Sequence, residues 1–257
     1  MKTFKLVGMT WMAVLMCVNF TSCTEDEPQY ELIHEGKKIV KMEIEDPYTS
    51  TVSQFKYNKK GQVTEIVREG EYDNVTFNYA WGSNKIGPYH LKDGLISNDY
   101  NTEVTYNSNK RPIEVGGNSD YSSYTSYTWG ADRLLRMSPY HWKQNGAQVL
   151  YMLHFEYGEP LTCNGYNPII PILLSRELFD DYLCVAHPEL MNARTTILPH
   201  SFKKDDYYTN DSGRLDYDTY KGYILYRFDD DGYIVECIMR ENTLYDVLET
   251  KYIITWE

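Results

Sequence analysis

Residue types that carry out chemistry are present in this sequence, but they do not stand at the spacing that the common catalytic motifs require. The chain contains no G-x-S-x-G nucleophile turn, no H-E-x-x-H helix, no phosphate-binding loop and no G-x-G-x-x-G turn. A glycoside hydrolase needs only two well-placed carboxylates, which no sequence pattern excludes. We therefore expect neither an enzyme nor a cofactor, and we keep a carboxylate-dependent glycoside hydrolase as the third functional hypothesis.

The acidic residues and histidines do not form a metal-binding pattern. Asp229-Asp230-Asp231 begins like a calcium loop, but Arg240 occupies the twelfth position, where such loops carry a bidentate glutamate. The six histidines stand singly at positions 34, 90, 141, 154, 187 and 200. We expect no metal site, a hairpin turn at Asp229, and solvated carboxylates at Asp180-Asp181 and Asp205-Asp206.

The first residues indicate export and lipid attachment. A short basic stretch, Met1–Lys5, precedes the apolar stretch Leu6–Phe20, and small residues stand directly before Cys23. An apolar stretch of about 15 residues is too short to span a hydrocarbon core of ~30 Å. The pattern predicts a signal peptide over residues 1–22 with a lipid on Cys23; the alternative is an ordinary signal peptide cut elsewhere, with Cys23 a plain thiol.

The residues after Cys23 form an acidic tether, which we place at residues 23–37. Glu25, Asp26 and Glu27 cannot bury themselves, and they resemble the acidic export signal of Bacteroidetes surface lipoproteins. We expect an outer-membrane lipoprotein that faces the cell exterior; its periplasmic face is the alternative. The net charge is −12, and loss of Lys2 and Lys5 with the leader makes it −14. This excess disfavours nucleic acid and anionic lipid head groups as partners.

Three segments repeat one hairpin pattern. Phe55–Val63 matches Tyr226–Ile234 position for position, and Tyr208–Leu215 shares the turn with one residue shifted. Asn or Asp begins each turn by bonding its own backbone, and glycine supplies the positive φ that reverses the chain, at Gly61, Gly213 and Gly232. Thr105–Ile113 is a looser copy that lacks the glycine.

A second element recurs between these hairpins. Tyr79-Ala-Trp81-Gly82 matches Tyr127-Thr-Trp129-Gly130, and the chain ends with Trp256 where a third tryptophan would fall. The residues before each tryptophan alternate between β-branched or aromatic and polar types, which predicts half-buried antiparallel strands. Ile39–Ile44 is expected to open the sheet.

One segment breaks the alternation. Apolar residues near helical spacing predict a helix at about 170–186, starting after Pro171 and stopping before Pro188. Leu174, Leu178 and Tyr182 form its apolar stripe. We expect this helix to cover the concave side of the sheet, with any ligand site beside it and lined by tyrosines; the alternative is a core plug without a ligand. Residues 192–206 read as a loop.

These hairpins, the helical insertion, Thr195–Pro199 and the unit Phe228–Tyr233 resemble the Bacteroidetes lipoproteins of unknown function described as having a porin-like fold. The resemblance covers roughly residues 40–257 and implies a strongly curved antiparallel sheet with no assigned activity. We therefore predict a mainly β chain, built as a strongly curved antiparallel meander sheet or a partly open barrel. Its single domain spans residues 38–257, with a helix-containing insertion at about 160–206.

Cysteine usage does not indicate a disulfide framework. Besides Cys17 and Cys23, the chain carries Cys163, Cys184 and Cys237. Because three is an odd number, at least one of them cannot pair within the chain, and the pairing stays open.

The aromatic residues are unusual in number, with 25 tyrosines and 5 tryptophans. Tyrosine is favoured on half-exposed antiparallel sheets for structural reasons alone. The functional alternative is a concave face that binds a glycan or another small amphipathic ligand. The leading hypothesis is accordingly a surface binding lipoprotein, followed by an interaction component of a surface assembly with a protein partner. The candidate ligand-binding residues are Tyr79, Trp81, Tyr127, Trp129 and Tyr182.

Overall fold

The computed structural model of the chain describes residues 36–71, 74–99, 102–117, 123–143, 146–176, 182–209, 213–244 and 246–257. The predicted signal peptide, Cys23 and most of the predicted tether lie outside these residues. Leu32–Glu257 forms one compact unit. Within the described residues, no helix combines the length and apolar character needed to cross a membrane.

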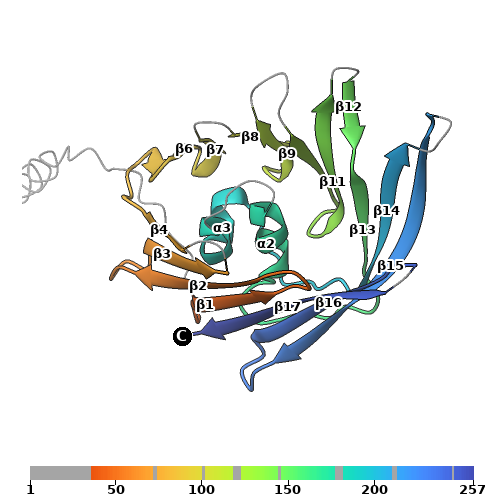
Figure 1. The fold of residues 1–257 in the computed structure, drawn as a ribbon. Coiled ribbons are helices and arrows are strands. Elements are labelled where there is room, and N and C mark those ends of the chain that lie inside the picture. Colours follow the sequence, from red (N-terminus) through yellow and green to blue (C-terminus); the bar gives the residue numbers. More distant parts are fainter. Residues whose placement is uncertain are drawn as a thin grey trace, which may run out of the picture. The chain divides into compact units, whose positions relative to one another are not determined.

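The described residues form a 17-stranded antiparallel sheet in which neighbours in sequence are usually neighbours in space (Figure 1). Most strands carry an alternating pattern of buried and exposed residues, as the sequence predicts. The strands are β1 (Ile39–Glu45), β2 (Ser50–Tyr57), β3 (Val63–Gly70), β4 (Asn74–Asn78), β5 (Lys85–Ile86), β6 (Tyr89–Lys92), β7 (Leu95–Asn98), β8 (Thr102–Tyr106), β9 (Pro112–Gly117), β10 (Tyr124–Trp129), β11 (Leu134–Lys143), β12 (Gly146–Val149), β13 (Tyr151–Glu156), β14 (Ser201–Thr209), β15 (Leu215–Phe228), β16 (Ile234–Asn242) and β17 (Val247–Trp256).

The sheet curves so strongly that its first strand meets its last. β1 pairs antiparallel with both β2 and β17. Among the described residues, the link between β4 and β5 is a single bridge from Trp81 to Ile86, so the ladder is interrupted there and the sheet is not closed into a barrel. This arrangement confirms the predicted curved antiparallel sheet and the predicted opening strand.

The predicted hairpin turns share one set of hydrogen bonds. Asn58 Oδ1 accepts from the amides of Lys60 and Gln62, and the Gly61 amide donates to the Asn58 carbonyl. Asp229 does the same at the second copy. The turn glycines have the expected positive φ, with values of 78° at Gly61, 74° at Gly213 and 80° at Gly232.

The looser copy at residues 107–111 forms the same turn without glycine. Asn107 Oδ1 accepts from the amides of Asn109 and Arg111, and the Lys110 amide donates to the Asn107 carbonyl. Lys110 stands in the glycine position with a φ of 58°. The side-chain oxygen of the first residue is therefore sufficient to form the turn, and lysine accepts a backbone conformation that disfavours it.

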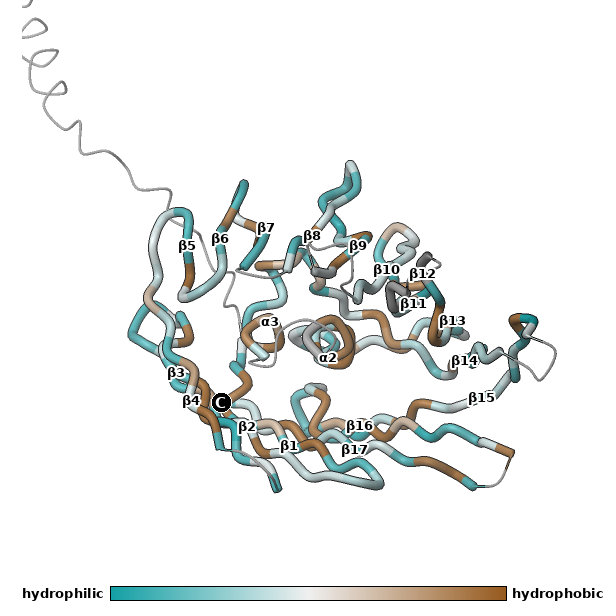
Figure 2. The backbone as a smooth tube through the Cα atoms, turned by 45° about the horizontal axis from the view of Figure 1, so that its top comes forward, coloured by the Kyte–Doolittle hydropathy of each residue, from teal (hydrophilic) through white to brown (hydrophobic). Residues whose placement is uncertain are grey.

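Residues 157–200, called the insertion, replace a hairpin turn between β13 and β14 and carry the helices. Figures 1 and 2 show α2 (Ile169–Arg176) and α3 (Leu183–Ala186) inside the curve of the sheet, as predicted. Ile170, Leu174 and Val185 are completely buried. The helix therefore covers the concave side of the sheet.

The boundaries of this insertion differ from the prediction. α2 begins at Ile169, and Pro171 lies in its first turn, where its missing amide proton costs no helical bond. A single helix to residue 186 is wrong, because Tyr182 has a φ of 58° and α3 starts after it. Leu178 lies outside the described residues. The predicted loop at 192–206 is also wrong after residue 200, where β14 begins.

The insertion is hydrogen-bonded to each of four hairpin turns at one end of the strands. His187 Nε2 accepts from the amide of Val63, and Thr195 Oγ1 donates to the Asp132 carbonyl. Amide side chains bind the other two turns: Asn192 Nδ2 donates to the carbonyls of Asn109 and Lys110, and Asn164 Nδ2 donates to that of Asp231. The insertion thus joins turns that are distant in sequence and fills this end of the hollow.

Candidate functional site

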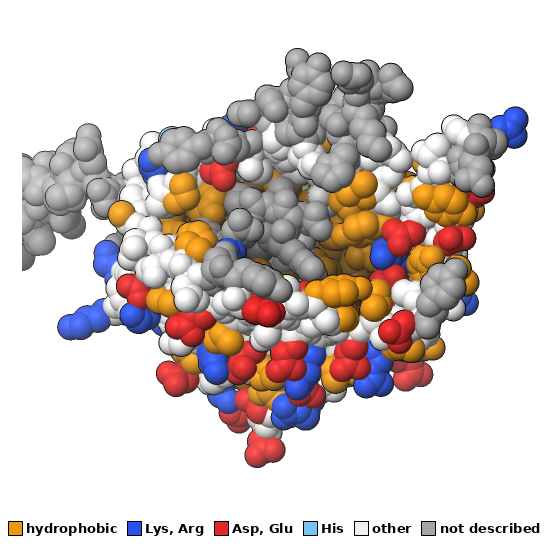
Figure 3. Space-filling view, viewed as in Figure 1, with side chains coloured by type: hydrophobic (Ala, Val, Ile, Leu, Met, Phe, Trp, Pro, Cys, Tyr) orange, Lys and Arg blue, Asp and Glu red, His pale blue; other side chains and the backbone are white. Residues whose placement is uncertain are grey.

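The hollow contains a pocket of about 320 Å³ next to α2, which we call the concave pocket. It lies toward the strand ends opposite to the four turns that the insertion holds. Figure 3 shows hydrophobic side chains gathered in the hollow and charged side chains over the outer strands. The concave pocket is lined by Asp46, Pro47, Tyr48, Met137, Tyr151, Leu153, Leu173, Phe202, Lys204, Met239, Glu241, Leu248, Thr250 and Tyr252.

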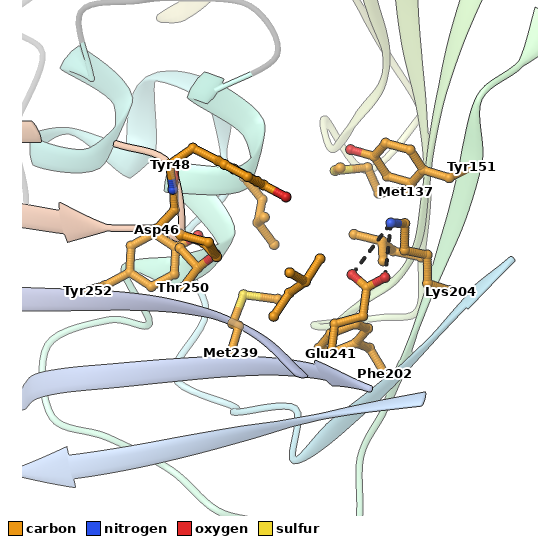
Figure 4. A pocket seen from close by; sticks show the side chains of 14 residues that line it. Asp46, Tyr48, Met137, Tyr151, Phe202, Lys204, Met239, Glu241, Thr250 and Tyr252 are labelled. Atoms are coloured by element: carbon orange, nitrogen blue, oxygen red, sulfur yellow. Dashed lines mark hydrogen bonds and ion pairs between the residues drawn. The ribbon is translucent and has the colours of Figure 1, made fainter. Parts of the chain in front are cut away.

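One ion cluster forms the polar wall of this pocket. The Lys204 ammonium lies 3.1 Å from Glu241 Oε1 and 3.2 Å from Asp206 Oδ2, and we call these three residues the Lys204 triad. The same ammonium lies 5.3 Å from the ring centre of Tyr151. Figure 4 shows Lys204 and Glu241 on the wall that faces the Tyr48 side chain. The pocket therefore has an apolar floor and one charged wall.

The charge of Lys204 is stabilised despite its position. Burial by itself lowers the pKa of the ammonium, but the charges and hydrogen bonds of Glu241 and Asp206 outweigh burial and raise it above the ordinary value. Lys204 is therefore protonated at neutral pH. Both carboxylates bind that one ammonium, so the triad carries one net negative charge.

A glycine on β15 makes room for this arrangement. Gly222 lies opposite Phe202 on one side and Glu241 on the other. A Cβ atom at Gly222 would lie 2.2 Å from Cζ of Phe202. Because the Phe202 ring occupies the space over Gly222, a larger residue there would displace a side chain that lines the pocket.

The two tryptophans that were predicted to bind a ligand instead donate hydrogen bonds to the backbone of the sheet. The indole Nε1 of Trp81 donates to the Val63 carbonyl, and that of Trp129 donates to the Pro112 carbonyl, both at 2.7 Å. Trp256 makes the equivalent bond to Ile234, also at 2.7 Å. Each acceptor is the first residue of a strand that follows a hairpin turn, so the tryptophans fix the repeat, and none of them lines the concave pocket.

The three predicted tyrosines take different places. Tyr79 and Tyr127 are buried, with 6% and 4% of their surface exposed, and do not line the concave pocket. Tyr182 lines a hollow of about 120 Å³ that shares Asp46 and Tyr252 with the concave pocket. Of the five candidates, only Tyr182 therefore lies at the border of the pocket.

The expectation of a solvated carboxylate at Asp205 is wrong. Asp205 is 6% exposed on the outer face, where its carboxylate accepts hydrogen bonds from Thr219 Oγ1 at 2.7 Å and from Lys203 Nζ at 3.1 Å. Burial raises the pKa of this carboxyl, but these two hydrogen bonds and the charges of Lys203 and His154 together outweigh burial, and the pKa lies below its ordinary value. These partners satisfy the charge of Asp205, and Asp205 does not line the concave pocket.

The described cysteines are all buried thiols outside any disulfide, at Cys163, Cys184 and Cys237. Burial raises the pKa of the Cys163 thiol to about 12 and raises that of Cys237 well above its ordinary value. Among the described residues, no group of three or more His, Cys, Asp or Glu side chains could hold a metal ion.

Comparison with known proteins bears on the fold. No family model matches the chain, and no curated protein matches its sequence. A porin-like protein from Bacteroides uniformis ATCC 8492 superposes with a TM-score of 0.51 at 12% identity, over 85% of this chain and 96% of that one. A porin-like protein from Bacteroides vulgatus ATCC 8482 gives a TM-score of 0.52 at 13% identity, over 85% and 98%.

The chain has the fold of these porin-like proteins. The predicted resemblance is thereby confirmed for the architecture, which is mainly β with few helices. At 12% and 13% identity the comparison supports the fold alone. A functional conclusion must come from the site itself.

The concave pocket was not predictable from the repeats, because its residues lie outside the repeated marks. Lys204 and Glu241 are 37 positions apart in the sequence. They meet because β15 is the single strand between β14 and β16 in the sheet. Gly222 was the available signal, since a glycine inside a long alternating strand often marks a close approach of neighbouring groups.

Proposed function

We propose that this chain is an exported lipoprotein that binds a small amphipathic ligand, such as a glycan or another partly apolar molecule, in its concave pocket. The observation that carries the proposal is the pocket of about 320 Å³ beside α2, with an apolar floor and one charged wall. Ligand sites commonly enclose roughly 300–1,000 Å³ and combine apolar walls with few polar groups. The insertion fills the opposite end of the hollow, and Leu173 of α2 lines the pocket.

Two other features support the exported state. The leader and Cys23 have the pattern of a lipid-attachment site, and the neighbours that share this fold are porin-like proteins from Bacteroides. We propose an outer-membrane location with the domain facing the cell exterior; the periplasmic face is the alternative. Metabolic labelling with a fatty-acid probe should mark the wild-type chain and leave Cys23→Ala unmarked. Equal labelling of both would refute lipid attachment at Cys23.

A hollow of about 410 Å³ along β7 and β8 is a weaker candidate. Most of the described residues that line it have polar or charged side chains, including Lys92, Asp93, Ser97 and Asn107. Few apolar side chains are available there to bury the body of a ligand. The smaller concave pocket therefore fits an amphipathic ligand better, although its volume is lower.

The binding proposal can be tested by filling the pocket. Met239 lines the pocket and is partly exposed, so Met239→Trp should occupy the cavity without removing core contacts. Ile238→Trp is the matched control, because Ile238 is the preceding residue on the same strand and points to the outer face. A screen of glycans and alkyl amphiphiles by thermal shift should find ligands that stabilise wild type and Ile238→Trp but not Met239→Trp. Ligands that stabilise all three equally would place the site elsewhere.

One observation favours the second functional hypothesis, a component of a surface assembly. β15 pairs with β16 only from Lys221 onward, whereas it pairs with β14 from Leu215. Residues 215–220 therefore present one open edge, with Leu215 58% and Tyr217 52% exposed. Open edges recruit other strands, but the Tyr217 amide already donates to Asp216 Oδ1. If this hydrogen bond is sufficient to prevent the open edge from pairing with another chain, sedimentation analysis should show a monomer.

A further inference from the structure

Acidic side chains outnumber basic side chains in the concave pocket. Lys204 is the single cation among the described residues that line it, whereas Glu241 and Asp46 are both acidic. Asp206 adds a third carboxylate within 3.2 Å of the Lys204 ammonium. The pocket with this neighbour therefore carries two more negative than positive charges, in a chain whose net charge is −12.

The single cation is not available to an anionic ligand. Glu241 holds the Lys204 ammonium with both carboxylate oxygens, at 3.1 and 3.4 Å, and Asp206 occupies another side. The Lys204 side chain is only 19% exposed. An anionic head group would have to displace one of these carboxylates while it is repelled by the other.

The second acid of the pocket is held in place by the β1–β2 turn. Asp46 Oδ1 accepts from the amides of Tyr48 and Thr49, each at 2.8 Å, and Oδ2 accepts from Thr49 Oγ1 at 3.0 Å. Hydrogen bonds donated to a carboxylate stabilise its charge. Asp46 therefore contributes a fixed negative charge at the side of the pocket opposite to the triad.

Aromatic rings stand between these two acidic regions. Figure 4 shows Tyr48 and Tyr151 pointing toward one another across the pocket, and Tyr252 lies below Tyr48. Tyr48 is 77% exposed, so its ring is accessible to a ligand. The faces of aromatic rings attract cations and repel anions, and Tyr151 already lies against the Lys204 ammonium.

We propose that the concave pocket selects amphipathic ligands with a cationic head group, and that the Lys204 triad sets this selectivity. The inference rests on the proposed function, since it names the ligand class of the same pocket. The apolar tail lies on the floor formed by Leu153, Leu173 and Met239, and the head group lies between Tyr48 and the triad carboxylates.

Three probes with one tail and different head groups test the proposal. Octyltrimethylammonium, octyl glucoside and octanoate are titrated calorimetrically, below their micelle concentrations, into the chain that begins at Thr24, which retains the compact unit Leu32–Glu257. We expect octyltrimethylammonium to bind about tenfold more tightly than octanoate at low salt, with octyl glucoside between them. The difference should shrink at high salt, because the pocket is open to solvent.

Variants of the triad should act in opposite directions. Glu241→Gln removes the surplus negative charge of the triad. It should therefore lower the affinity for octyltrimethylammonium about threefold to tenfold and raise the affinity for octanoate. Lys204→Met removes the competing ammonium, so it should strengthen octyltrimethylammonium by a similar factor. A general disturbance of the fold would instead lower the affinity for octyltrimethylammonium in both variants. Glu249→Gln is the matched control: it breaks the ion pair with Arg240, which lies on the outer face of the same sheet, and should leave binding unchanged.

The outcomes separate the two proposals. The proposed selectivity for cationic head groups is refuted if octanoate binds as tightly as octyltrimethylammonium. It is also refuted if Lys204→Met lowers the affinity for octyltrimethylammonium. In both cases the pocket still binds amphiphiles. If octyl glucoside alone binds, the pocket is a site for uncharged ligands such as glycans, and the charge assignment is again refuted. If Met239→Trp leaves the affinity of every probe unchanged, binding occurs outside the pocket and the proposed function fails with it.

Discussion

Replacement of Lys110 by glycine should stabilise this protein, although it removes a side chain. Lys110 occupies the fourth position of the turn that Asn107 begins, with a φ of 58°. The equivalent positions in the matching turns hold Gly61 and Gly232. The Lys110 side chain is exposed, and its bond to Asn192 uses the backbone carbonyl, which glycine retains.

The expected gain is a difference between two terms. A residue with a Cβ atom loses roughly 1–2 kcal/mol in the left-handed region, and glycine removes that cost. Glycine also makes the unfolded chain more flexible, which offsets about 0.5–1 kcal/mol. The free energy of unfolding of Lys110→Gly should therefore exceed that of wild type by about 0.5–1 kcal/mol. For a domain of this size, that gain corresponds to an increase in Tm of about 1–4 °C.

Urea unfolding followed by tryptophan fluorescence measures this difference. Gly213→Ala is the matched reverse change, because Gly213 has a φ of 74° and no atom lies within 4 Å of the added Cβ. It should therefore lower the free energy of unfolding by a similar amount through the backbone alone. If Lys110→Gly unfolds at the same or lower urea concentration while Gly213→Ala is destabilised, then Lys110 is not strained and its side chain has a stabilising role.

Three further changes test the insertion and the core. His187→Ala should lower the free energy of unfolding by about 1–3 kcal/mol, because the buried amide of Val63 loses its acceptor; urea titration beside wild type measures this. Leu174→Ala should lower the free energy of unfolding by about 2–5 kcal/mol in the same assay, since Leu174 is fully buried beneath the sheet. A loss of less than about 1 kcal/mol would place α2 at the surface. Cys163, with a pKa of about 12, and Cys237 should resist iodoacetamide at about pH 8 in the native chain and react after unfolding, as mass spectrometry would show.

The hairpin turns were predictable because their chemistry is local. A single Asn or Asp side chain bonds the backbone two and four residues later, and the glycine position follows from the φ that the turn requires. Even the copy with Lys110 keeps its Asn107 bonds. Local hydrogen bonds therefore carry the repeat, and the curved sheet follows from joining such hairpins in sequence.

The start of β14 was not predictable, because its charges are satisfied only by other strands. Residues 201–206 read Ser-Phe-Lys-Lys-Asp-Asp, which shows no apolar alternation. In the fold, Lys204 turns inward to Glu241, and Lys203 turns outward to Asp205. A strand with ion pairs on both faces carries no hydrophobic period, so sequence patterns assign it to a loop.

The helix was predicted as one continuous element for a related reason. Apolar spacing identifies which residues must be buried, and Leu173, Leu174 and Val185 are all buried as expected. The spacing does not report the left-handed backbone of Tyr182, which reorients the chain before α3. Burial alone therefore fixes the composition of the insertion but not its path.

The repeated aromatic residues and the pocket residues answer to different constraints. Trp81, Trp129 and Trp256 recur because three of the hairpins use an indole donor to the carbonyl of the first residue after the turn. Residues that recur for such a structural bond report the framework. A ligand site in such a fold must instead use residues that break the period, and the concave pocket does so with Lys204, Glu241 and the space over Gly222. The odd residues of a repetitive sheet, together with the tyrosines beside them such as Tyr48 and Tyr151, are therefore where a binding function should be sought in this fold.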